Sequence, residues 1–486
     1  MTKALLVNLP RYDTVAPPSA IGILAGICEA NNVDYDICDF SVIIKEHFSN
    51  EDFLSIDNWL TFVNNNIEQK LKNQLIGLWQ THVVSRLPNY ELAAISVFTY
   101  WSLPIAKLLF EYQITQDIGN CKVVVGGNGV QSRFPDTQQS FEDWAKQNNI
   151  ADYVIFGEAE TPFDSILKGI TTGPGINNQN FVQEDNLDSF PFPSYKKFQM
   201  SKYSRNRLYI TGSRGCVRKC TFCDIQNMWP KFRYRSAENI IQEIKNNYYE
   251  TGITQYDFTD SLINGSVSNF YRFNSLLAEE KSRNNDLKDV SYIGQAIVRP
   301  RHQMPEHHYE AMYYAGCEQV TIGIESFSES VRNHMLKKFS NQDIDYHAKQ
   351  CSYWGIKNIW LMITGYPTET LKDHQDNLNG LKHYQKYAKQ GIIEMIRWGT
   401  TMHLIEDTPI TDPAMLKSLE IEQNHNYNKM ISDWHYNWVS KKNPSLDLRE
   451  RLRRRLEIHF ESVKLGYPQP RVIEELEIIN ALAEYI

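Results

Sequence analysis

Residues 212–223 read Gly-Ser-Arg-Gly-Cys-Val-Arg-Lys-Cys-Thr-Phe-Cys, and this stretch decides both the fold and the chemistry that the sequence predicts. It follows an apolar strand predicted over Leu208–Thr211 and places Cys216, Cys220 and Cys223 within eight residues. The chain has eight cysteines in 486 residues, which is too few for a disulfide scaffold, and the other five are scattered singly. Three clustered thiols in a reducing compartment therefore predict a metal site.

The number of ligands separates the metals that such a loop can hold. A structural zinc site needs four ligands, commonly two CxxC pairs, and no second pair exists in this sequence. Zinc with a distant histidine or Cys317 as its fourth ligand stays an alternative. An iron–sulfur cube ordinarily takes four thiolates, so three leave one iron open, as catalysis requires. Arg214, Arg218 and Lys219 stand beside the thiols, where positive charge favours thiolates and partly offsets a negative cluster.

Strand and helix signals alternate before this loop, which predicts an α/β protein. Residues 1–170 are expected to form an open, doubly wound, mostly parallel sheet with a helical insertion at about 41–88. A linker is expected over 171–200, where a Gly-Pro-Gly turn and the run Phe190–Pro193 occur. The predicted strands of the first domain are Leu5–Leu9, Tyr35–Cys38, Ala94–Thr99, Lys122–Val125 and Tyr153–Phe156.

Alternation resumes over 201–410, where six units predict a partial (β/α)6 barrel. Ligands of both kinds of sheet bind at the carboxyl ends of the strands. The strand signal fades after about 411, so 411–486 is predicted to be a C-terminal helical region. The predicted barrel strands are Leu208–Thr211, Tyr256–Thr259, Ser291–Ala296, Val320–Ile324, Ile359–Ile363 and Ile393–Ile396.

One C-terminal helix carries a concentration of arginines. Its apolar residues repeat every four positions, and the preferred interpretation of the arginines is a solvated basic face. Contact with an anionic substrate or RNA is the alternative. The apolar residues are Leu448, Leu452, Leu456 and Phe460, and the arginines are Arg449, Arg451, Arg453, Arg454 and Arg455.

Composition narrows the classes of function. The 50 Lys and Arg against 58 Asp and Glu give a net charge of −8, which argues against broad nucleic-acid binding. No apolar run reaches about 18 residues, so no membrane span is expected. The apolar stretch at the N-terminus is too short for a secretory signal and predicts a first buried strand. A cytoplasmic protein is therefore expected.

The CxxxCxxC spacing after the first barrel strand, with Phe222 before the last cysteine, resembles the radical S-adenosylmethionine (SAM) superfamily. The resemblance implies that Cys216, Cys220 and Cys223 hold a [4Fe-4S] cluster whose open iron binds SAM. One electron then cleaves SAM to methionine and a 5′-deoxyadenosyl radical. The resemblance also implies that Phe222 packs near the adenine, and that an external one-electron donor such as flavodoxin or ferredoxin reduces the cluster.

Later stretches agree with this resemblance. The segment Gly316–Ser326 contains the Gly-Ile-Glu-Ser pattern of the family's fourth strand, and Gly365–Thr370 matches the turn after the fifth. An acidic residue at a strand end is also a common N-cap, and the turn also makes a good helix entry, so structural roles stay open. By resemblance, the expected SAM contacts are Asp260, Arg299, Glu325 and Ser326.

The order of the two domains resembles the cobalamin-binding class of radical SAM enzymes. Glycines at strand ends let a backbone approach a large ligand, and the residues expected near cobalamin are Gly126, Gly127, Gly157 and Glu158. The Asp-x-His-x-x-Gly motif that gives many such domains a cobalt ligand is absent. The loop after the first strand reads Pro10-Arg11-Tyr12-Asp13-Thr14, and His82 lies out of register as an expected surface residue. A degenerate domain that only shapes the substrate pocket is the alternative.

The first functional hypothesis is a cobalamin-dependent radical SAM enzyme, most often a methyltransferase, acting on a small molecule. The absence of an obvious acid–base pair or nucleophilic triad fits a cofactor that carries the difficult chemistry. The alternatives are a cobalamin-independent rearrangement, cyclisation or oxidation enzyme, a tRNA methylthiotransferase, and a non-catalytic iron–sulfur module. A methylthiotransferase would need a second cysteine triad, which Cys28, Cys38 and Cys121 do not resemble.

Overall fold

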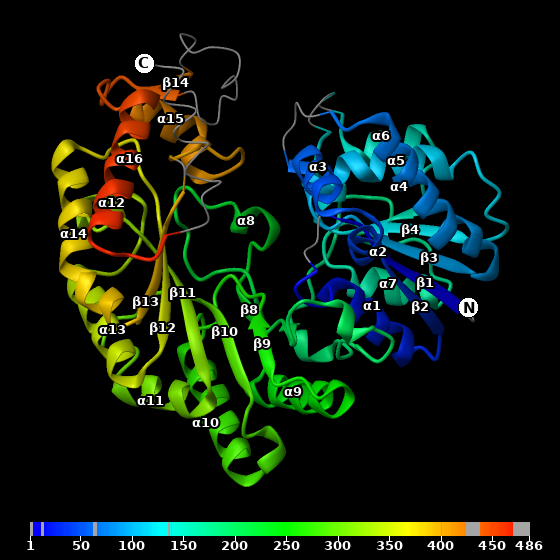
Figure 1. The fold of residues 1–486 in the computed structure, drawn as a ribbon, viewed down its shortest axis with the longest axis horizontal. Helices are drawn as coiled ribbons and strands as arrows, with labels where there is room; N and C mark the ends of the chain where they lie inside the picture. The colour runs from blue at the N-terminus through cyan, green and yellow to red at the C-terminus, as the bar shows by residue number, and fades with distance from the viewer. Residues whose placement is uncertain are drawn as a thin grey trace. The chain divides into compact units, whose positions relative to one another are not determined.

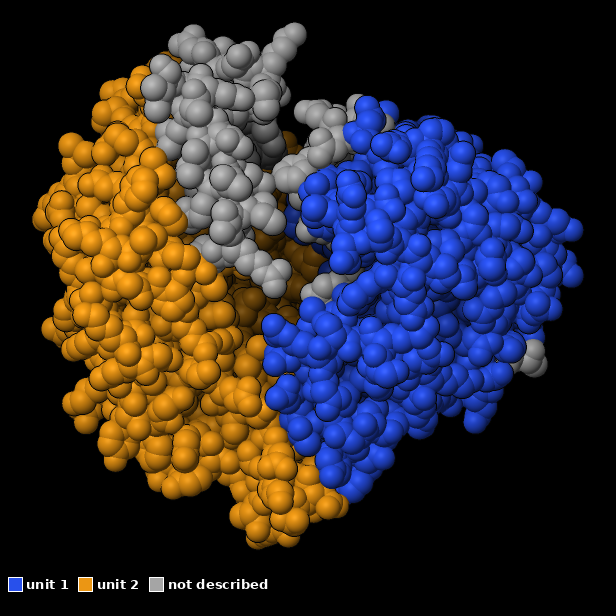
Figure 2. Space-filling view, viewed as in Figure 1, with its two compact units in different colours: residues 1–210, 242–255 blue, residues 211–241, 256–486 orange. Residues whose placement is uncertain are grey.

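The protein forms two compact units in a computed structural model (Figures 1 and 2). Unit 1 comprises residues 1–210 and 242–255, and unit 2 comprises 211–241 and 256–486. The domain boundaries expected at about 170, 200 and 410 stay predictions. No helix of the described part of the chain has the length and apolar character needed to span a bilayer. The structure describes residues 3–10, 14–61, 66–134, 137, 139–399, 401–423 and 438–469.

Unit 1 is built on a five-stranded sheet in the order β2-β1-β3-β4-β5, and its neighbouring strands pair in parallel. This confirms the predicted doubly wound sheet. The order reverses between β1 and β3, which is where such sheets bind ligands. The strands are β1 (Lys3–Asn8), β2 (Asp34–Asp39), β3 (Leu92–Ser96), β4 (Lys122–Gly126) and β5 (Tyr153–Val154), and the crossovers contain α1 (Ser19–Ala30), η2 (Tyr100–Ser102), α5 (Leu103–Gln113), η3 (Asn128–Gln131), α6 (Phe141–Gln147) and α7 (Glu160–Leu167).

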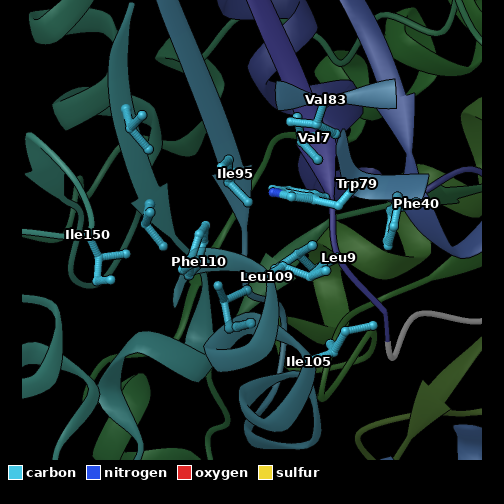
Figure 3. Packing of buried hydrophobic residues seen from close by; sticks show 14 of the residues in the cluster. Val7, Leu9, Phe40, Trp79, Val83, Ile95, Ile105, Leu109, Phe110 and Ile150 are labelled. Carbon is cyan, nitrogen blue, oxygen red and sulfur yellow. The ribbon is translucent and has the colours of Figure 1, made fainter. Parts of the chain in front are cut away.

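The predicted insertion is helical, and it completes the core of unit 1. Trp79 is fully buried, and its ring packs edge-on against Phe40, with centroids 5.2 Å apart, and against Phe110, at 6.4 Å (Figure 3). Val7 and Leu9 of the first strand segment belong to the same cluster. Without these helices one side of the sheet would lose its central aromatic residue. They are α2 (Phe40–His47), α3 (Asn50–Thr61), α4 (Gln69–His82) and η1 (Val84–Asn89).

The expected linker packs against unit 1 rather than running free. The Ser194 hydroxyl donates to Glu29 at 2.6 Å, and the Lys197 ammonium pairs with Asp34 at 2.6 Å. Gly26 of α1 must be glycine here, because an added Cβ would lie 2.0 Å from the Phe192 carbonyl oxygen. Two short helices lie in or next to this segment, η4 (Leu187–Ser189) and η5 (Met200–Lys202).

Unit 2 contains most of an open six-stranded sheet in the order β13-β12-β11-β10-β9-β6. The pairs from β10 to β13 are parallel, and helices line the outer side of the sheet (Figure 1), which confirms the predicted partial barrel. The strands are β6 (Arg207–Ile210), β9 (Gln255–Phe258), β10 (Ser291–Ala296), β11 (Cys317–Glu325), β12 (Lys357–Met362) and β13 (Ile393–Trp398), and the helices between them are α9 (Ala237–Thr251), α10 (Val267–Arg283), η6 (Asn285–Leu287), α11 (Glu306–Ala315), α12 (Glu329–His334), α13 (Asn341–Trp354) and α14 (Leu371–Lys389).

Smaller elements surround the carboxyl ends of these strands. Two two-stranded antiparallel sheets, β7–β8 and β14–β15, carry no signal that the sequence analysis detected. The described residues after 411 also include the helices α15 and α16, and the prediction of a helical region over 411–486 stays a prediction. These elements are β7 (Ser213–Arg214), α8 (Ile225–Met228), β8 (Arg233–Tyr234), η7 (Pro409–Thr411), α15 (Pro413–Leu419), β14 (Ile421–Gln423), β15 (Trp438–Ser440) and α16 (Leu448–Lys464).

The arginines of α16 correct the sequence-based interpretation. Arg451, Arg454 and Arg455 are at most 2% exposed, so the prediction of a solvated basic face is wrong for these three. They share one side of the helix because residues three and four positions apart are neighbours. Arg451 lies 3.8 Å over the Trp438 ring, and Arg455 donates to the carbonyl oxygens of Trp398 and Gly399. Arg449 and Arg453 are exposed, as predicted.

Candidate functional site

The three clustered cysteines lie on the loop between β7 and α8 in unit 2. Cys220 is buried, and Cys216 and Cys223 are half-buried. Burial raises the pKa of Cys220, and it raises the pKa of Cys223 to about 11. The charges of Cys216 and Cys220 raise the pKa of Cys223 further, so the thiols lie within electrostatic reach of one another. Their repulsion as thiolates would be relieved by a bound cation.

The arrangement does not fit the zinc alternative through Cys317. That residue begins β11 and Glu325 ends it, eight residues later, which is about 26 Å along a strand. Glu325 acts electrostatically on Cys220, so the cluster loop lies near the carboxyl end of β11. Cys317 lies at the other end of this strand. Within the described ranges, no three His, Cys, Asp or Glu side chains converge on a point where one metal ion could sit. A cube that meets each thiolate through a different iron does not require such convergence.

Thr221, between Cys220 and Cys223, anchors the loop. Its amide donates to the Met335 carbonyl at 3.2 Å, and its hydroxyl lies 2.8 Å from the hydroxyl of Tyr366. Its own carbonyl accepts from the Ile410 amide at 2.7 Å. Thr221 is 1% exposed, so three segments distant in sequence fix the centre of the cysteine loop.

Asp260 follows β9 and holds the start of the same loop. Its carboxylate accepts from the Gly212 amide at 2.7 Å and from the Ser213 hydroxyl at 2.5 Å. Burial raises its pKa to about 7, against the opposing effect of these hydrogen bonds. The structure thus shows a positioning role for Asp260, while its contact with SAM stays a prediction.

Glu325 lies beside the cluster loop in an unusual backbone conformation. Its φ angle is +68°, and the register of β11 against β12 shifts between Gly323 and Glu325. Such strained conformations persist where the surrounding structure demands them, often at functional sites. The Glu325 carboxylate pairs with the Lys337 ammonium at 2.9 Å, and both side chains are buried. The shift turns a charged group at the strand end toward a charged partner.

Lys337 is a candidate site residue that the sequence analysis did not identify. Burial lowers its pKa, but the charges of Glu325, Cys220 and Cys223 raise it more, so Lys337 is a cation. Its ammonium also donates to the Gly323 carbonyl at 3.0 Å and lies 5.7 Å from the centre of the Phe222 ring. The sequence around it, Leu336-Lys337-Lys338, looks like an ordinary surface segment.

The other predicted SAM residues of unit 2 lie at the same end of the sheet. Arg299 donates to the carbonyl oxygens of Asn264 and Gly265, both at 2.8 Å. Burial lowers its pKa to about 10, the charge of Arg218 lowers it too, and that of Cys216 opposes both. Phe222 packs against a small apolar cluster that includes Tyr366 and Trp438.

Ser326 is fully buried, and chain atoms engage its polar groups. Its hydroxyl lies 3.0 Å from the Asn377 side-chain oxygen and accepts from the Ser328 amide at 3.1 Å, while its carbonyl accepts from Arg332 at 2.5 Å. These contacts give Ser326 a structural role in the turn after β11, and its contact with SAM stays a prediction.

A cleft of about 790 Å³ opens beside the cluster loop, within the size range of small-molecule sites. Gln226, whose amide donates to the carbonyl oxygens of Cys216 and Arg218, forms part of its wall. The lining of the cleft also includes Asp407, which lies two residues before η7, and Asp412, which directly precedes α15.

The glycines predicted to lie near cobalamin end β4 and follow β5 in unit 1. Gly127 has a φ of +103°, and a Cβ there would lie 2.5 Å from the Val97 carbonyl oxygen. Gly157 has a φ of +74°, and its Cβ would lie 2.4 Å from the Phe181 ring. The packing of the chain therefore requires both glycines, whether or not a ligand binds.

Three other predictions concern unit 1. Gly126 is less constrained, with Ile155 in ordinary contact, and Glu158 is buried and accepts from the Glu184 amide at 3.3 Å. Residues 11–13 of the loop after β1 lie outside the described residues. His82 ends α4, is half-buried, and lies with its ring 5.5 Å from that of His47.

Comparison with known proteins decides what the unit 2 sheet is. Residues 210–379 match the family model described as the radical SAM superfamily. The chain contains a radical SAM domain. The match starts at the last residue of β6 and ends within α14, so it encloses the cysteine loop, Glu325 and Lys337.

Curated relatives of the chain include methyl- and methylthiotransferases. An uncharacterized methyltransferase of Pyrococcus horikoshii is 25% identical over 46% of this chain, and the match spans half of that relative's length. A ribosomal protein uS12 methylthiotransferase of Clostridium botulinum is 24% identical over 70% of this chain and 80% of its own.

Solved structures share the fold of the whole chain. The cobalamin-dependent SAM radical enzyme OxsB, solved with aqua-cobalamin and SAM, matches all of this chain and 71% of its own, with a TM-score of 0.66 and 14% identity. The radical SAM methyltransferase TsrM from Kitasatospora setae, solved with cobalamin and a [4Fe-4S] cluster, covers 88% of this chain and 82% of its own, with a TM-score of 0.60 and 14% identity. At such identities the likeness establishes the fold.

Proposed function

We propose that this protein is a radical SAM enzyme, cobalamin-dependent, that transfers a methyl group to a small molecule. One observation carries the proposal: a loop of three thiols lies beside the buried pair of Lys337 and Glu325 within a domain of radical SAM sequence. The three thiols account for metal binding, and the pair accounts for recognition of an amino acid group.

The residues present fit a [4Fe-4S] cluster. Cys216, Cys220 and Cys223 would hold it, and when bound it supplies the electron for reductive cleavage of SAM. The Nε atom of buried Arg299 has no acceptor among the described residues, and its other nitrogens donate to neutral oxygens, so a nearby negative cluster would balance its charge. Lys337 lowers the pKa of Cys220, which favours the thiolate that binds iron. Thr221 keeps the two flanking thiols in place.

The pair of Lys337 and Glu325 suits the methionine end of SAM. That end carries an ammonium and a carboxylate on one carbon, and the pair offers one charge of each sign 2.9 Å apart. Charge-assisted hydrogen bonds are about twice as strong as neutral ones, and burial keeps water from competing for them. We assign Lys337 to the carboxylate and Glu325 to the ammonium. Phe222, with Lys337 near its ring, would line the same pocket.

Cobalamin binding has its support in the fold. The sheet of unit 1 has the strand order of ligand-binding doubly wound sheets, and the solved structures of this fold that carry cobalamin match 88% or more of the chain. When bound, cobalamin carries the methyl group. Gly127 and Gly157 add no independent support, because the chain itself occupies the space that their missing side chains leave.

Methylthiotransfer is the second candidate, favoured by the Clostridium relative. Its second cluster would need three more cysteines in unit 1. Cys38 lies near the carboxyl end of β2, and Cys121 directly precedes the first residue of β4. Because the strands are parallel, these two thiols lie at opposite ends of the strands. Cys28 lies on α1, and burial raises the pKa of all three. Methyl transfer is therefore the better supported function.

Anaerobic reconstitution with iron and sulfide, followed by SAM and an external one-electron donor such as flavodoxin, tests the proposal. Wild-type protein is expected to bind iron and form 5′-deoxyadenosine, and Cys220→Ala to lose this activity while remaining folded. Cys121→Ala is the matched control and should retain it. Zinc without iron in the wild type would refute the radical SAM assignment, and loss of activity in Cys121→Ala would favour the methylthiotransferase.

Parallel reactions with and without methylcobalamin test whether the enzyme transfers a methyl group and whether this transfer depends on cobalamin. Candidate small molecules are supplied as mixtures, and products are scored by mass for an added methyl group. Methylation that depends on added cobalamin supports the proposal. A modified product that forms equally without cobalamin would identify a cobalamin-independent radical enzyme instead.

A further inference from the structure

The C-terminal helix α16 is bound to the turn that follows β12. Arg454 donates to the Glu369 carboxylate at 3.0 Å and to the carbonyl oxygens of Glu369 and Thr370, both at 3.1 Å. Both side chains of this ion pair are at most 1% exposed. The second carboxylate oxygen of Glu369 accepts from the Gly365 amide at 3.0 Å. One buried carboxylate therefore ties α16 to both ends of the turn 365–370.

The same turn is held at two further points from the C-terminal segment. Arg451 lies with its aliphatic carbons against Gly365, where an added Cβ would be 2.5 Å away, and the φ of Gly365 is +79°. Its guanidinium stacks on Trp438 and donates to the Trp438 and Leu446 carbonyl oxygens. Asn443 donates to the Glu369 carbonyl at 3.0 Å. Residues 438–454 thus fix the turn far more tightly than a helix entry needs.

Tyr366 carries this constraint to the cluster loop. Its hydroxyl donates to the His334 carbonyl at 3.3 Å and accepts from the Thr221 hydroxyl at 2.8 Å. Both hydroxyl-bearing residues are at most 2% exposed. A buried hydroxyl pair costs desolvation that an apolar pair of the same shape would avoid, but it fixes direction and distance, which apolar packing does not.

We infer that Tyr366 is a positioning residue for the iron–sulfur cluster, and that the C-terminal segment sets its place through the turn 365–370. Thr221 directly follows Cys220 and lies two positions before Cys223, so a shift of Thr221 displaces both thiols. The inference rests on the proposed function. It extends the site to α16, through the contacts of Arg454 and Arg451 with the turn 365–370.

The test compares Tyr366→Phe with Tyr309→Phe. Tyr309 is equally buried, and its hydroxyl lies 3.0 Å from His347 in the outer helix layer. Tyr366→Phe is expected to bind as much iron as the wild type, to change the paramagnetic resonance spectrum of the reduced cluster with SAM, and to form 5′-deoxyadenosine about tenfold more slowly. Tyr309→Phe should match the wild type in all three measurements.

A second variant tests the link through Thr221. Thr221→Val keeps the shape and removes the hydroxyl, so it should reproduce the spectrum of Tyr366→Phe, and the double variant should be no slower than either single variant. Arg454→Lys should shift the spectrum in the same direction by less. A wild-type spectrum and rate in Tyr366→Phe, or fully additive losses in the double variant, would overturn the inference. A wild type that forms no 5′-deoxyadenosine would instead refute the proposed function.

Discussion

Replacing Lys337 by Met should destabilise the folded protein by about 4 kcal/mol near neutral pH. The Glu325 side chain is 10% exposed, so without its partner it must remain as a buried charge or take a proton. A pH of about 7.5 is about three units above the usual pKa of a glutamate. Protonating Glu325 at this pH therefore costs about 4 kcal/mol, at about 1.4 kcal/mol per unit. The cost of protonation is the upper limit of the destabilisation, because the protein protonates Glu325 when keeping the charge costs more. It agrees with the loss of roughly 3–5 kcal/mol measured when one partner of a buried ion pair is removed.

The pH dependence of this loss follows from the same reasoning. In Lys337→Met the buried carboxylate of Glu325 has lost its cation, so burial favours its neutral form and the lost stability is expected to return as the pH falls. Between about pH 7.5 and about pH 5.5 the deficit should shrink by about 2 to 3 kcal/mol. Urea unfolding of the anaerobic protein, followed by circular dichroism at several pH values, measures it.

Two further variants make the prediction specific. Lys357→Met removes a partner of Glu394 at 2.7 Å, but these side chains are 53% and 33% exposed, so the loss should stay below about 1 kcal/mol. The double variant Lys337→Met with Glu325→Gln should recover most of the stability but not the affinity for SAM. Equal losses in the two single lysine variants, or a loss that is constant with pH, would show that Glu325 is not held as a buried charge.

Three other substitutions test separate parts of the structure. The folded pKa of Asp260 is raised to about 7, so protonation stabilises the fold, and the unfolding free energy of the wild type should fall as the pH rises through about 7. Asp260→Asn should remove this fall, and urea unfolding across this pH range measures it. Gly157→Ala should lower the melting temperature through a cost of about 1–3 kcal/mol, and Phe181→Ala in the same chain should recover part of it. Arg451→Gln should cost about 2–4 kcal/mol in urea unfolding, whereas exposed Arg453→Gln should cost less than about 1 kcal/mol.

The buried strands were predictable because their pattern is local. Ser291–Ala296 was predicted and observed with the same bounds, and Leu208–Thr211 is displaced by one residue from β6. A strand buried on both faces is a continuous apolar run, as Val123–Val125 of β4 is, and the sequence displays such runs directly. The fifth strand was predicted to reach Phe156, but it ends at Val154. Phe156 instead donates to the Gly175 carbonyl, a partner 19 positions away that no local pattern indicates.

The cysteine loop can be located from the sequence alone, whereas the charges around it cannot. The CxxxCxxC spacing of the three thiols is visible in the sequence. Lys337 pairs with Glu325 because the irregular register of β11 turns Glu325 toward it, and the sequence does not show this. The arginines of α16 offered a signal that was misinterpreted. Arg451, Arg454 and Arg455 share the spacing of a buried helix face, and only the assumption that charged residues face water placed them outside.

The charge balance of the site indicates what it is built to hold. The chain carries a net charge of −8, yet the cluster loop is flanked by the buried cations Lys337 and Arg299. Glu325 balances Lys337, but the acceptors of Arg299 within the described ranges are neutral carbonyl and amide oxygens. A buried cation without an anion is costly, so the site is incomplete as protein alone. Three thiolates around a metal cluster would supply the missing negative charge at the place where the cations already lie.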